Sequence, residues 1–131
     1  MKKVFLGGTC NGSLWRDGFI KDLKINYFQP VLNGEWTKAM MQEEIRQREL
    51  CDFCLYVITP KMTGVYSIAE VVDDSNKQPA KTIFCYLTKD ENKTFNKAQI
   101  KSLEQTAKMI MKNGAQFFKS LPEASDYLNN H

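Results

Sequence analysis

The sequence predicts a single α/β domain built on a parallel sheet. Short apolar runs alternate with amphipathic segments along all 131 residues, a pattern typical of successive β-α units. The run at 53–59, FCLYVIT, is almost entirely apolar, which indicates a strand buried on both faces, as in the middle of a parallel sheet. The length suits one domain, so we expect residues 1–131 to form a single unit.

Three strands and two helices are expected in the first half of the chain. The apolar runs place strands at residues 3–6, 27–32 and 53–59, and the amphipathic segments place helices at 13–25 and 36–50. Ser13 is a candidate N-cap of the first helix because its hydroxyl can accept a bond from a backbone amide. Asn33-Gly34 indicates a turn after the second strand.

The second half continues the alternation. A helix at 64–76 is expected to bury Val65, Ile68, Ala69 and Val72. Further on we expect a strand at 82–87, a polar loop at 89–97, a helix at 98–112, a strand at 115–119 and a helix at 122–130. Asn113-Gly114 is a good C-terminal signal for the helix before it, and a proline opens the last helix.

Five strands with short connections predict a doubly wound, flavodoxin-like sheet of order 2-1-3-4-5, with helices on both faces. In that order ligands bind where the winding reverses, beside the carboxyl ends of the first and third strands. Two loops therefore mark the candidate site. They are residues 7–13 and 60–64.

Composition narrows the class of protein. The net charge is +3 and the lysines are scattered among acidic residues, which argues against binding a nucleic-acid polymer. The longest apolar runs fall well short of the roughly 20 residues that a membrane span needs. Free thiols and the lack of an export signal predict a cytoplasmic protein.

The cysteines predict neither a metal site nor a cofactor. Cys51 and Cys54 match C-x-x-C, but the motif opens a strand, whereas a thioredoxin-type motif opens a helix. No second cysteine pair or internal histidine completes a zinc site. Cys54 and Cys85 lie in apolar runs, where cysteine acts as a small hydrophobe.

The loop after the first strand has the composition of an anion site. Its candidate binding residues are Gly7, Gly8, Thr9, Asn11, Gly12 and Ser13. Glycines let backbone amides turn toward a ligand, and the loop leads into a helix N-terminus, which favours anions. The steric needs of a tight turn explain the glycines equally well. Arg16 follows the loop and either meets a phosphate or is solvated.

The loop after the third strand leads to a candidate catalytic carboxylate. Gly64 precedes the helix, and Glu70 lies in its second turn, aligned with Tyr66, Asp73 and Asp74. This face is turned away from the expected apolar stripe, toward the crevice at the switch point. A solvated helix carboxylate is the alternative.

Several segments give the sequence a resemblance to the nucleoside 2-deoxyribosyltransferases, especially their short, divergent members, and more distantly to deoxynucleoside-monophosphate N-glycosidases. They are VFLGGTCNGS, RELCDFCLYVITP and GVYSIAE. The resemblance implies that Glu70, at the family's spacing after Asp52, is the catalytic glutamate. It also implies a homo-oligomer whose subunits complete each other's sites. Val72 and Asp74 stand where the family usually has glycine and alanine, and Gly64 replaces an aspartate that handles the leaving base.

The expected function is cleavage or exchange of the N-glycosidic bond of a nucleoside or its monophosphate. Glu70 would stabilise or capture an oxocarbenium-like sugar, Tyr66 would stack or hydrogen-bond, and Glu43 or Glu44 would supply a second carboxylate. One alternative is a non-catalytic nucleotide or nucleoside binder that uses the same crevice. Another is a flavodoxin-like electron carrier. The helices at 36–50 and 64–76 are candidates for the subunit contact.

Overall fold

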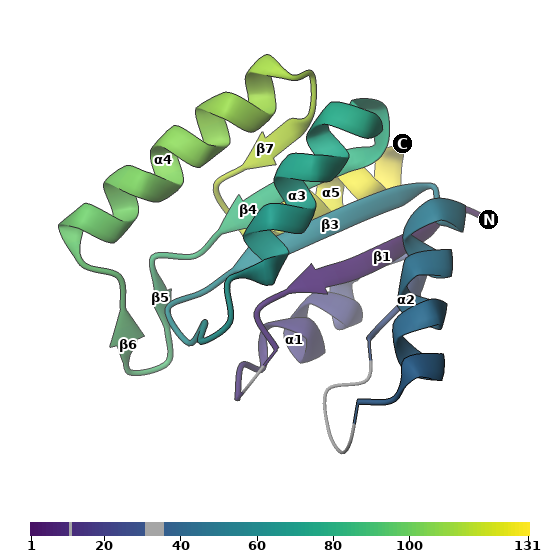
Figure 1. Cartoon of the computed structure of the whole chain (residues 1–131), viewed down its shortest axis with the longest axis horizontal. Helices are drawn as coiled ribbons and strands as arrows, with labels where there is room; N and C mark the ends of the chain where they lie inside the picture. The colour runs from purple at the N-terminus through teal and green to yellow at the C-terminus, as the bar shows by residue number, and fades with distance from the viewer. Residues whose placement is uncertain (11, 31–35) are drawn as a thin grey trace.

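The computed structural model describes residues 1–10, 12–30 and 36–131 as an α/β fold around a five-stranded, all-parallel sheet (Figure 1). In spatial order the strands are β2 (Asn26–Phe28), β1 (Lys3–Gly8), β3 (Phe53–Ile58), β4 (Thr82–Tyr86) and β7 (Gln116–Phe118). Each neighbouring pair is parallel. The predicted parallel sheet, with the run at 53–59 in its centre, is confirmed.

The strand order differs from the expected numbering because a hairpin precedes the last strand. The segment predicted as a polar loop at 89–97 contains β5 (Lys89–Asp90) and β6 (Lys93–Thr94), which pair antiparallel. Glu91 makes the tight turn between them with a φ of 53°. Strands of two residues show no periodicity, so the sequence gives no sign of this hairpin.

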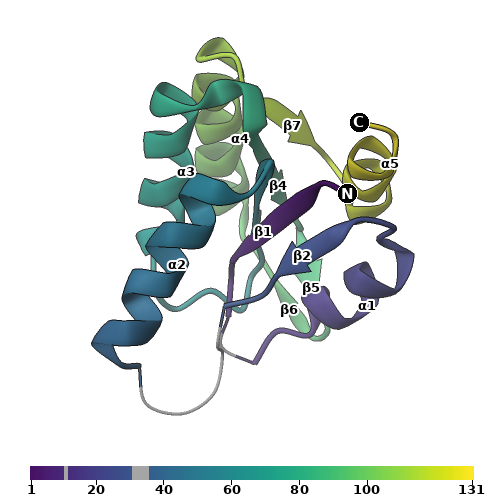
Figure 2. The same ribbon diagram turned by 90° about the vertical axis from the view of Figure 1, so that its right-hand side faces the viewer.

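Helices cover both faces of the sheet (Figure 2). One face packs on α1 (Trp15–Asp22) and α5 (Leu121–Asn130). The other packs on α3 (Tyr66–Lys77) and α4 (Lys97–Lys112). The helix α2 (Lys38–Leu50) lies beside α3. None of the helices in the described part of the chain is long and apolar enough to span a membrane.

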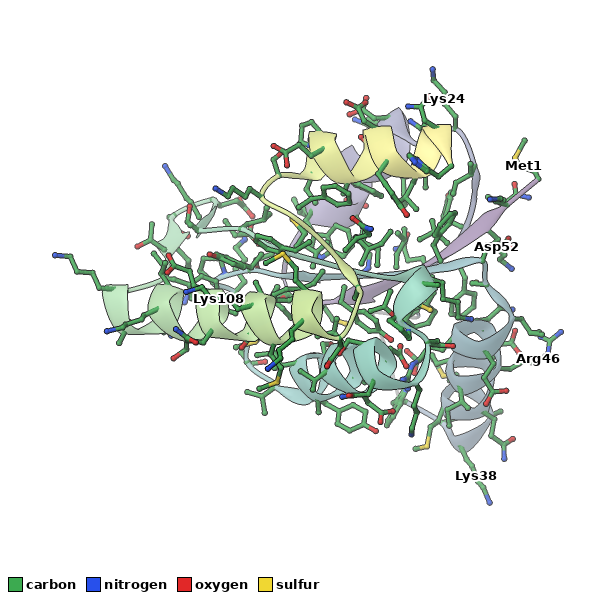
Figure 3. All side chains as sticks on the ribbon, turned by 90° about the horizontal axis from the view of Figure 1, so that it is seen from above. Met1, Lys24, Lys38, Arg46, Asp52 and Lys108 are labelled. Carbon is green, nitrogen blue, oxygen red and sulfur yellow. The ribbon has the colours of Figure 1, made fainter. Side chains whose placement is uncertain are left out.

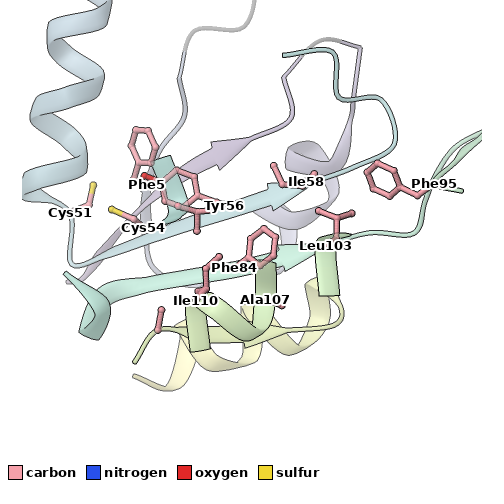
Figure 4. Close-up of a cluster of buried hydrophobic side chains, with 12 residues drawn as sticks. Phe5, Cys51, Cys54, Tyr56, Ile58, Phe84, Phe95, Leu103, Ala107 and Ile110 are labelled. Atoms are coloured by element: carbon pink, nitrogen blue, oxygen red, sulfur yellow. The ribbon is translucent and has the colours of Figure 1, made fainter. Parts of the chain in front are cut away.

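The central strand β3 divides its side chains between two cores. Leu55 and Val57 face the α1/α5 side, whereas Tyr56 and Ile58 face the α3/α4 side (Figure 4). All six residues of the strand are buried. Because both faces are covered, the strand has no polar alternation, which is why the sequence reads as one apolar run.

Two predicted helix details are wrong. Ser13 does not cap α1, because that helix begins at Trp15 after an N-cap residue, Leu14, with no side-chain cap bond. The expected buried stripe of α3 is right only for Ile68 and Val72, which are partly buried and pack against the core. Val65 and Ala69 are exposed, whereas the buried residues are Val71, Asp74 and Ser75. Val65 precedes the first helical residue, and polar groups occupy part of the buried face. The predicted turn at 33–34 lies outside the described residues.

Two glycines at the end of β1 are required by packing against β3. A Cβ atom on Gly7 would lie 2.8 Å from the Tyr56 ring. A Cβ atom on Gly8 would lie 2.0 Å from the Val57 carbonyl oxygen, and Gly8 has a φ of 113°. Both residues therefore let the chain pass close to β3, which the strand register also requires.

We predict that Gly8→Ala destabilises the fold by about 3 kcal/mol or more, because it combines a left-handed φ with a backbone clash. Gly18→Ala is the matched control. Gly18 lies within α1, with no atom within 4 Å of an added Cβ, so the substitution should stabilise by about 0.5–1 kcal/mol. Urea unfolding measures both, and similar small effects would contradict the packing role of Gly8.

Candidate active site

Two adjoining hollows form a crevice at the carboxyl ends of β1 and β3. Their volumes are about 670 and 460 Å³. The residues that line both are Gly8, Cys10, Trp36, Tyr66, Ser67 and Glu70. The larger hollow extends along α2, and the smaller one extends to the loop after β3. The place where the sequence predicts a ligand site, beside the carboxyl ends of β1 and β3, is therefore hollow in the folded chain.

A half-buried guanidinium holds Glu70 at the wall of this crevice. Arg48 Nη1, on α2, lies 3.2 Å from Glu70 Oε2, and Arg48 Nη2 lies 2.7 Å from Asp74 Oδ1. The Tyr56 hydroxyl, on β3, donates to the other Asp74 oxygen at 2.5 Å. The side chains of Arg48, Glu70 and Asp74 are only 17, 20 and 4% exposed. One network thus joins α2, α3 and β3.

Burial raises the pKa of Glu70, and the neighbouring Glu44 and Asp74 carboxylates add to this, although Arg48 opposes it. Burial also raises the pKa of Glu44, against the opposing effects of a Trp36 hydrogen bond, Arg16 and Arg48. Both carboxyl groups consequently hold a proton at higher pH than a solvated glutamate. Perturbed acids facing one cavity are typical of sites that move protons.

Arg48 itself stays charged. Burial lowers its pKa, but the Asp74 hydrogen bond and the charges of Tyr56, Asp74 and Glu70 outweigh that effect and raise the pKa. Its buried Nε atom has no hydrogen-bond partner among the described residues. Burial and the Asp74 carboxylate raise the pKa of Tyr56, which keeps its hydroxyl protonated as the donor to Asp74.

The Arg16 side chain is hydrogen-bonded to backbone carbonyls of β1 and of the loop after it. Its guanidinium, 1% exposed, donates to the carbonyl oxygens of Leu6 and Thr9. The Trp15 indole also donates to Thr9 O, at 2.9 Å. The expected solvated side chain is therefore wrong, whereas contact with a phosphate stays a prediction, because Arg16 also lines the larger hollow. The loop's carbonyls need these donors because they are buried away from water.

Some of the other residues around this loop line the crevice, and others contact the loop after β3 or the β5-β6 hairpin. Gly7 and Gly8 line the larger hollow and Thr9 the smaller. Ser13 instead donates to Asp90 at 2.5 Å, and the Gly12 carbonyl accepts from Lys61 Nζ at 3.0 Å. Neither Gly12 nor Ser13 is among the crevice residues. Asn11 lies outside the described residues.

Lys61, in the loop after β3, links this loop to the loop after β1 and to the β5-β6 hairpin. It bonds Gly12 of the first loop and pairs with Glu91 of the hairpin. The Thr59 amide donates to Thr9 Oγ1 at 3.0 Å, so the first loop is also bonded to the end of β3. These contacts hold the two crevice loops in one arrangement.

The other predicted site residues also line the crevice. Glu44 and Tyr66 line the larger hollow, and Gly64 and Tyr66 line the smaller. Tyr66 is the first residue of α3 and is 73% exposed. Asp52 lies at the opposite end of β3, where its carboxylate accepts from the Lys3 amide at 2.9 Å.

Sequence reasoning named Glu44 of α2 as a candidate carboxylate but missed the other residues that this helix contributes to the site. Met40, Glu44 and Arg48 follow one another at intervals of four and line the larger hollow, so helical spacing contained the signal. Trp36 also lines it, 57% exposed, and its indole donates to Glu44 at 3.1 Å. The only buried residue of α2 is Gln47. Self-association through this exposed helix stays a prediction.

The two cysteines of the C-x-x-C motif, Cys51 and Cys54, are buried free thiols. Cys51 is the C-cap residue of α2. Cys54 lies in β3, and its thiol donates to the Arg48 carbonyl oxygen at 3.3 Å. Burial raises the pKa of both thiols, that of Cys54 to about 12. Both therefore remain protonated at neutral pH and are poor nucleophiles.

Comparisons of the sequence with protein-family models and with curated proteins find no match. Comparison with solved structures finds no match either. The role of the crevice is therefore inferred from its own residues.

We predict that Arg48→Met destabilises the fold by about 3 kcal/mol, because it leaves Asp74 charged and buried without its cation. Arg46→Met is the matched control. Arg46 lies on the same helix and points into solvent (Figure 3), where it pairs with the exposed Glu43. Urea unfolding should show a large loss for Arg48→Met and almost none for Arg46→Met. Equal midpoints for the two variants would contradict the buried network.

Proposed function

We propose that this protein breaks the N-glycosidic bond of a deoxynucleoside or its monophosphate, with Glu70 as the nucleophile. The observation that supports this most is the Glu70 carboxylate, held by Arg48 in a crevice at the carboxyl ends of β1 and β3. The strand order around it is compatible with a flavodoxin-like, doubly wound fold. In such folds this crevice is the usual ligand site.

The chemistry needs a carboxylate that is ionised but only partly solvated. As the bond from the anomeric carbon to the base nitrogen breaks, its electron pair leaves with the base, and the sugar becomes oxocarbenium-like. A Glu70 oxygen then bonds the anomeric carbon and forms a glycosyl ester. Water or a second base attacks this carbon, which frees Glu70, and its proton passes to the carboxylate that protonated the leaving base. Arg48 pairs with Oε2, which leaves Oε1 for the sugar.

The leaving base needs a proton, and Glu44 is the residue that we assign to supply it. Glu44 lines the same hollow as Glu70, and burial raises its pKa. A carboxyl group that keeps its proton to higher pH is suited to general acid catalysis. This role takes the place of the aspartate that the resemblance expects where Gly64 stands.

Aromatic side chains offer a surface for the base. Trp36 and Tyr66 line both hollows and are 57 and 73% exposed. Met40 and Met41 add flexible apolar contacts. A planar base can lie against such a wall while the sugar faces Glu70.

We predict that Glu70→Gln lowers kcat about 10²–10³-fold, because it removes the charge that stabilises the sugar cation. Binding of the substrate should survive, since size and hydrogen-bonding capacity are kept. Asp73→Asn is the matched control on the exposed face of the same helix, where Asp73 pairs with Lys77. It should leave kcat unchanged.

The assay is release of free base from a panel of deoxynucleosides and their monophosphates, with and without an acceptor base, read by chromatography. Equal cleavage by wild type and Glu70→Gln would refute the assignment. Wild-type protein that binds these compounds without cleaving them would instead identify a non-catalytic nucleoside or nucleotide binder. A yellow purified protein would identify a flavin carrier.

We further predict a bell-shaped dependence of kcat on pH. Activity should rise as Glu70 ionises and fall as Glu44 loses its proton. Because the pKa of each group is raised, both limbs should lie above the pH of a solvated glutamate. Glu44→Gln should lower kcat and abolish the alkaline limb. The exposed Glu49, on the same helix, gives the control Glu49→Gln, which should keep both limbs. An alkaline limb that survives in Glu44→Gln would contradict its role.

A further inference from the structure

A separate hollow of about 730 Å³ lies between α4, the end of β4 and the start of α5. It shares no lining residue with the two hollows of the crevice. Much of its lining is apolar. These residues are Tyr86, Leu87, Ile100, Ala107, Met111, Phe117, Leu121 and Pro122. The Tyr86 and Phe117 rings stack with centroids 5.6 Å apart, so together they present a broad aromatic surface.

Three lysines from separate segments line the same hollow. Lys89 belongs to β5, Lys108 to α4, and Lys119 to the connection between β7 and α5. All three are exposed, and among the residues that the structure describes no carboxylate lies within 4 Å of their ammonium groups, although the Lys119 backbone amide donates to Glu123 at 3.3 Å. Glu104 is the acidic residue of the lining, so the lining carries a net positive charge.

The Tyr86 hydroxyl adds a hydrogen-bond donor. It makes no hydrogen bond to any other residue in the described ranges. Burial raises the pKa of Tyr86, and the Glu104 and Cys85 charges add to this effect, so the hydroxyl remains protonated. Apolar walls with a few converging polar groups are the usual make-up of a small-molecule site.

We propose that this hollow binds a small amphipathic anion. Its aromatic or acyl body lies on the rings of Tyr86 and Phe117 and against Met111. Its carboxylate, sulfonate or phosphate group lies near Lys89, Lys108 and Lys119. A second copy of the chain fits less well, because a two-fold contact through this patch would bring the lysines of both copies together.

The probe is 8-anilinonaphthalene-1-sulfonate, compared with N-phenyl-1-naphthylamine, which has the same rings but no sulfonate. The test variant is Lys89→Glu/Lys108→Glu/Lys119→Glu. The control is Lys93→Glu/Lys101→Glu/Lys112→Glu, which changes the net charge equally at exposed lysines of the hairpin and α4 that do not line the hollow. Fluorescence titration gives the affinity of each dye for each protein.

We expect the test variant to weaken sulfonate binding about tenfold or more, since three favourable charges become repulsive. The control should stay within about twofold, and neither variant should change N-phenyl-1-naphthylamine affinity. Glu70→Gln should also leave sulfonate binding unchanged, which separates this hollow from the crevice. If the Glu variant fails to fold, the variant with all three test lysines changed to Gln takes its place. We expect it to lose less sulfonate affinity than the Glu variant, because the charges are removed and not reversed.

Three results would overturn the proposal. Equal loss of sulfonate affinity in the test and control variants would mean that only net charge matters. Equal loss for both dyes would mean that the lysines do not recognise the anionic group. Dye fluorescence that falls as protein concentration rises would mean that a second copy covers the hollow.

Discussion

The arrangement of the crevice depends on one half-buried cation, Arg48. It pairs with Glu70 and Asp74 of α3, and Asp74 is bonded in turn by Tyr56 of the central strand. Gln47 is the only fully buried residue of α2, so polar contacts hold much of this helix in place. They are the Arg48 network and the Lys81 ammonium, which donates to carbonyl oxygens at the end of α2. The same guanidinium therefore positions the proposed nucleophile and the helix that carries Glu44. Removing it would leave the buried Asp74 carboxylate without its cation and would also break the link between Glu70 and α2.

Much of the fold could be predicted because apolar side chains dominate the sheet. The run FCLYVIT marked the central strand, since both of its faces are covered by helices. The prediction of buried positions and short elements failed where polar side chains are buried or hold a turn. Asp74 and Ser75 lie on the buried face of α3, which shifts its apparent stripe. The hairpin β5-β6 escaped notice because its strands are two residues long, and it is held by Ser13, Lys61 and a left-handed Glu91.

The candidate site was predictable in position but not in detail. Topology and resemblance pointed to Glu70 and the glycine loop, and Glu44 was one of two candidates for a second carboxylate. The solvated alternative for Arg16 was wrong because its partners are backbone carbonyls, which a sequence does not display. Arg48 was missed because its partner Asp74 is 26 residues away on another helix. Asp74 stands where the resembled family usually has alanine, and here that residue anchors the cation beside Glu70.

The most direct test of Glu70 as a nucleophile is covalent trapping. The protein is mixed with a deoxynucleoside, quenched rapidly in acid, digested, and analysed by peptide mass spectrometry. If Glu70 is the nucleophile, we expect a deoxyribosyl group esterified to the peptide that carries Glu70, and its loss in Glu70→Gln. Release of free base with a sugar adduct on a different residue, or with the same adduct in Glu70→Gln, would contradict it.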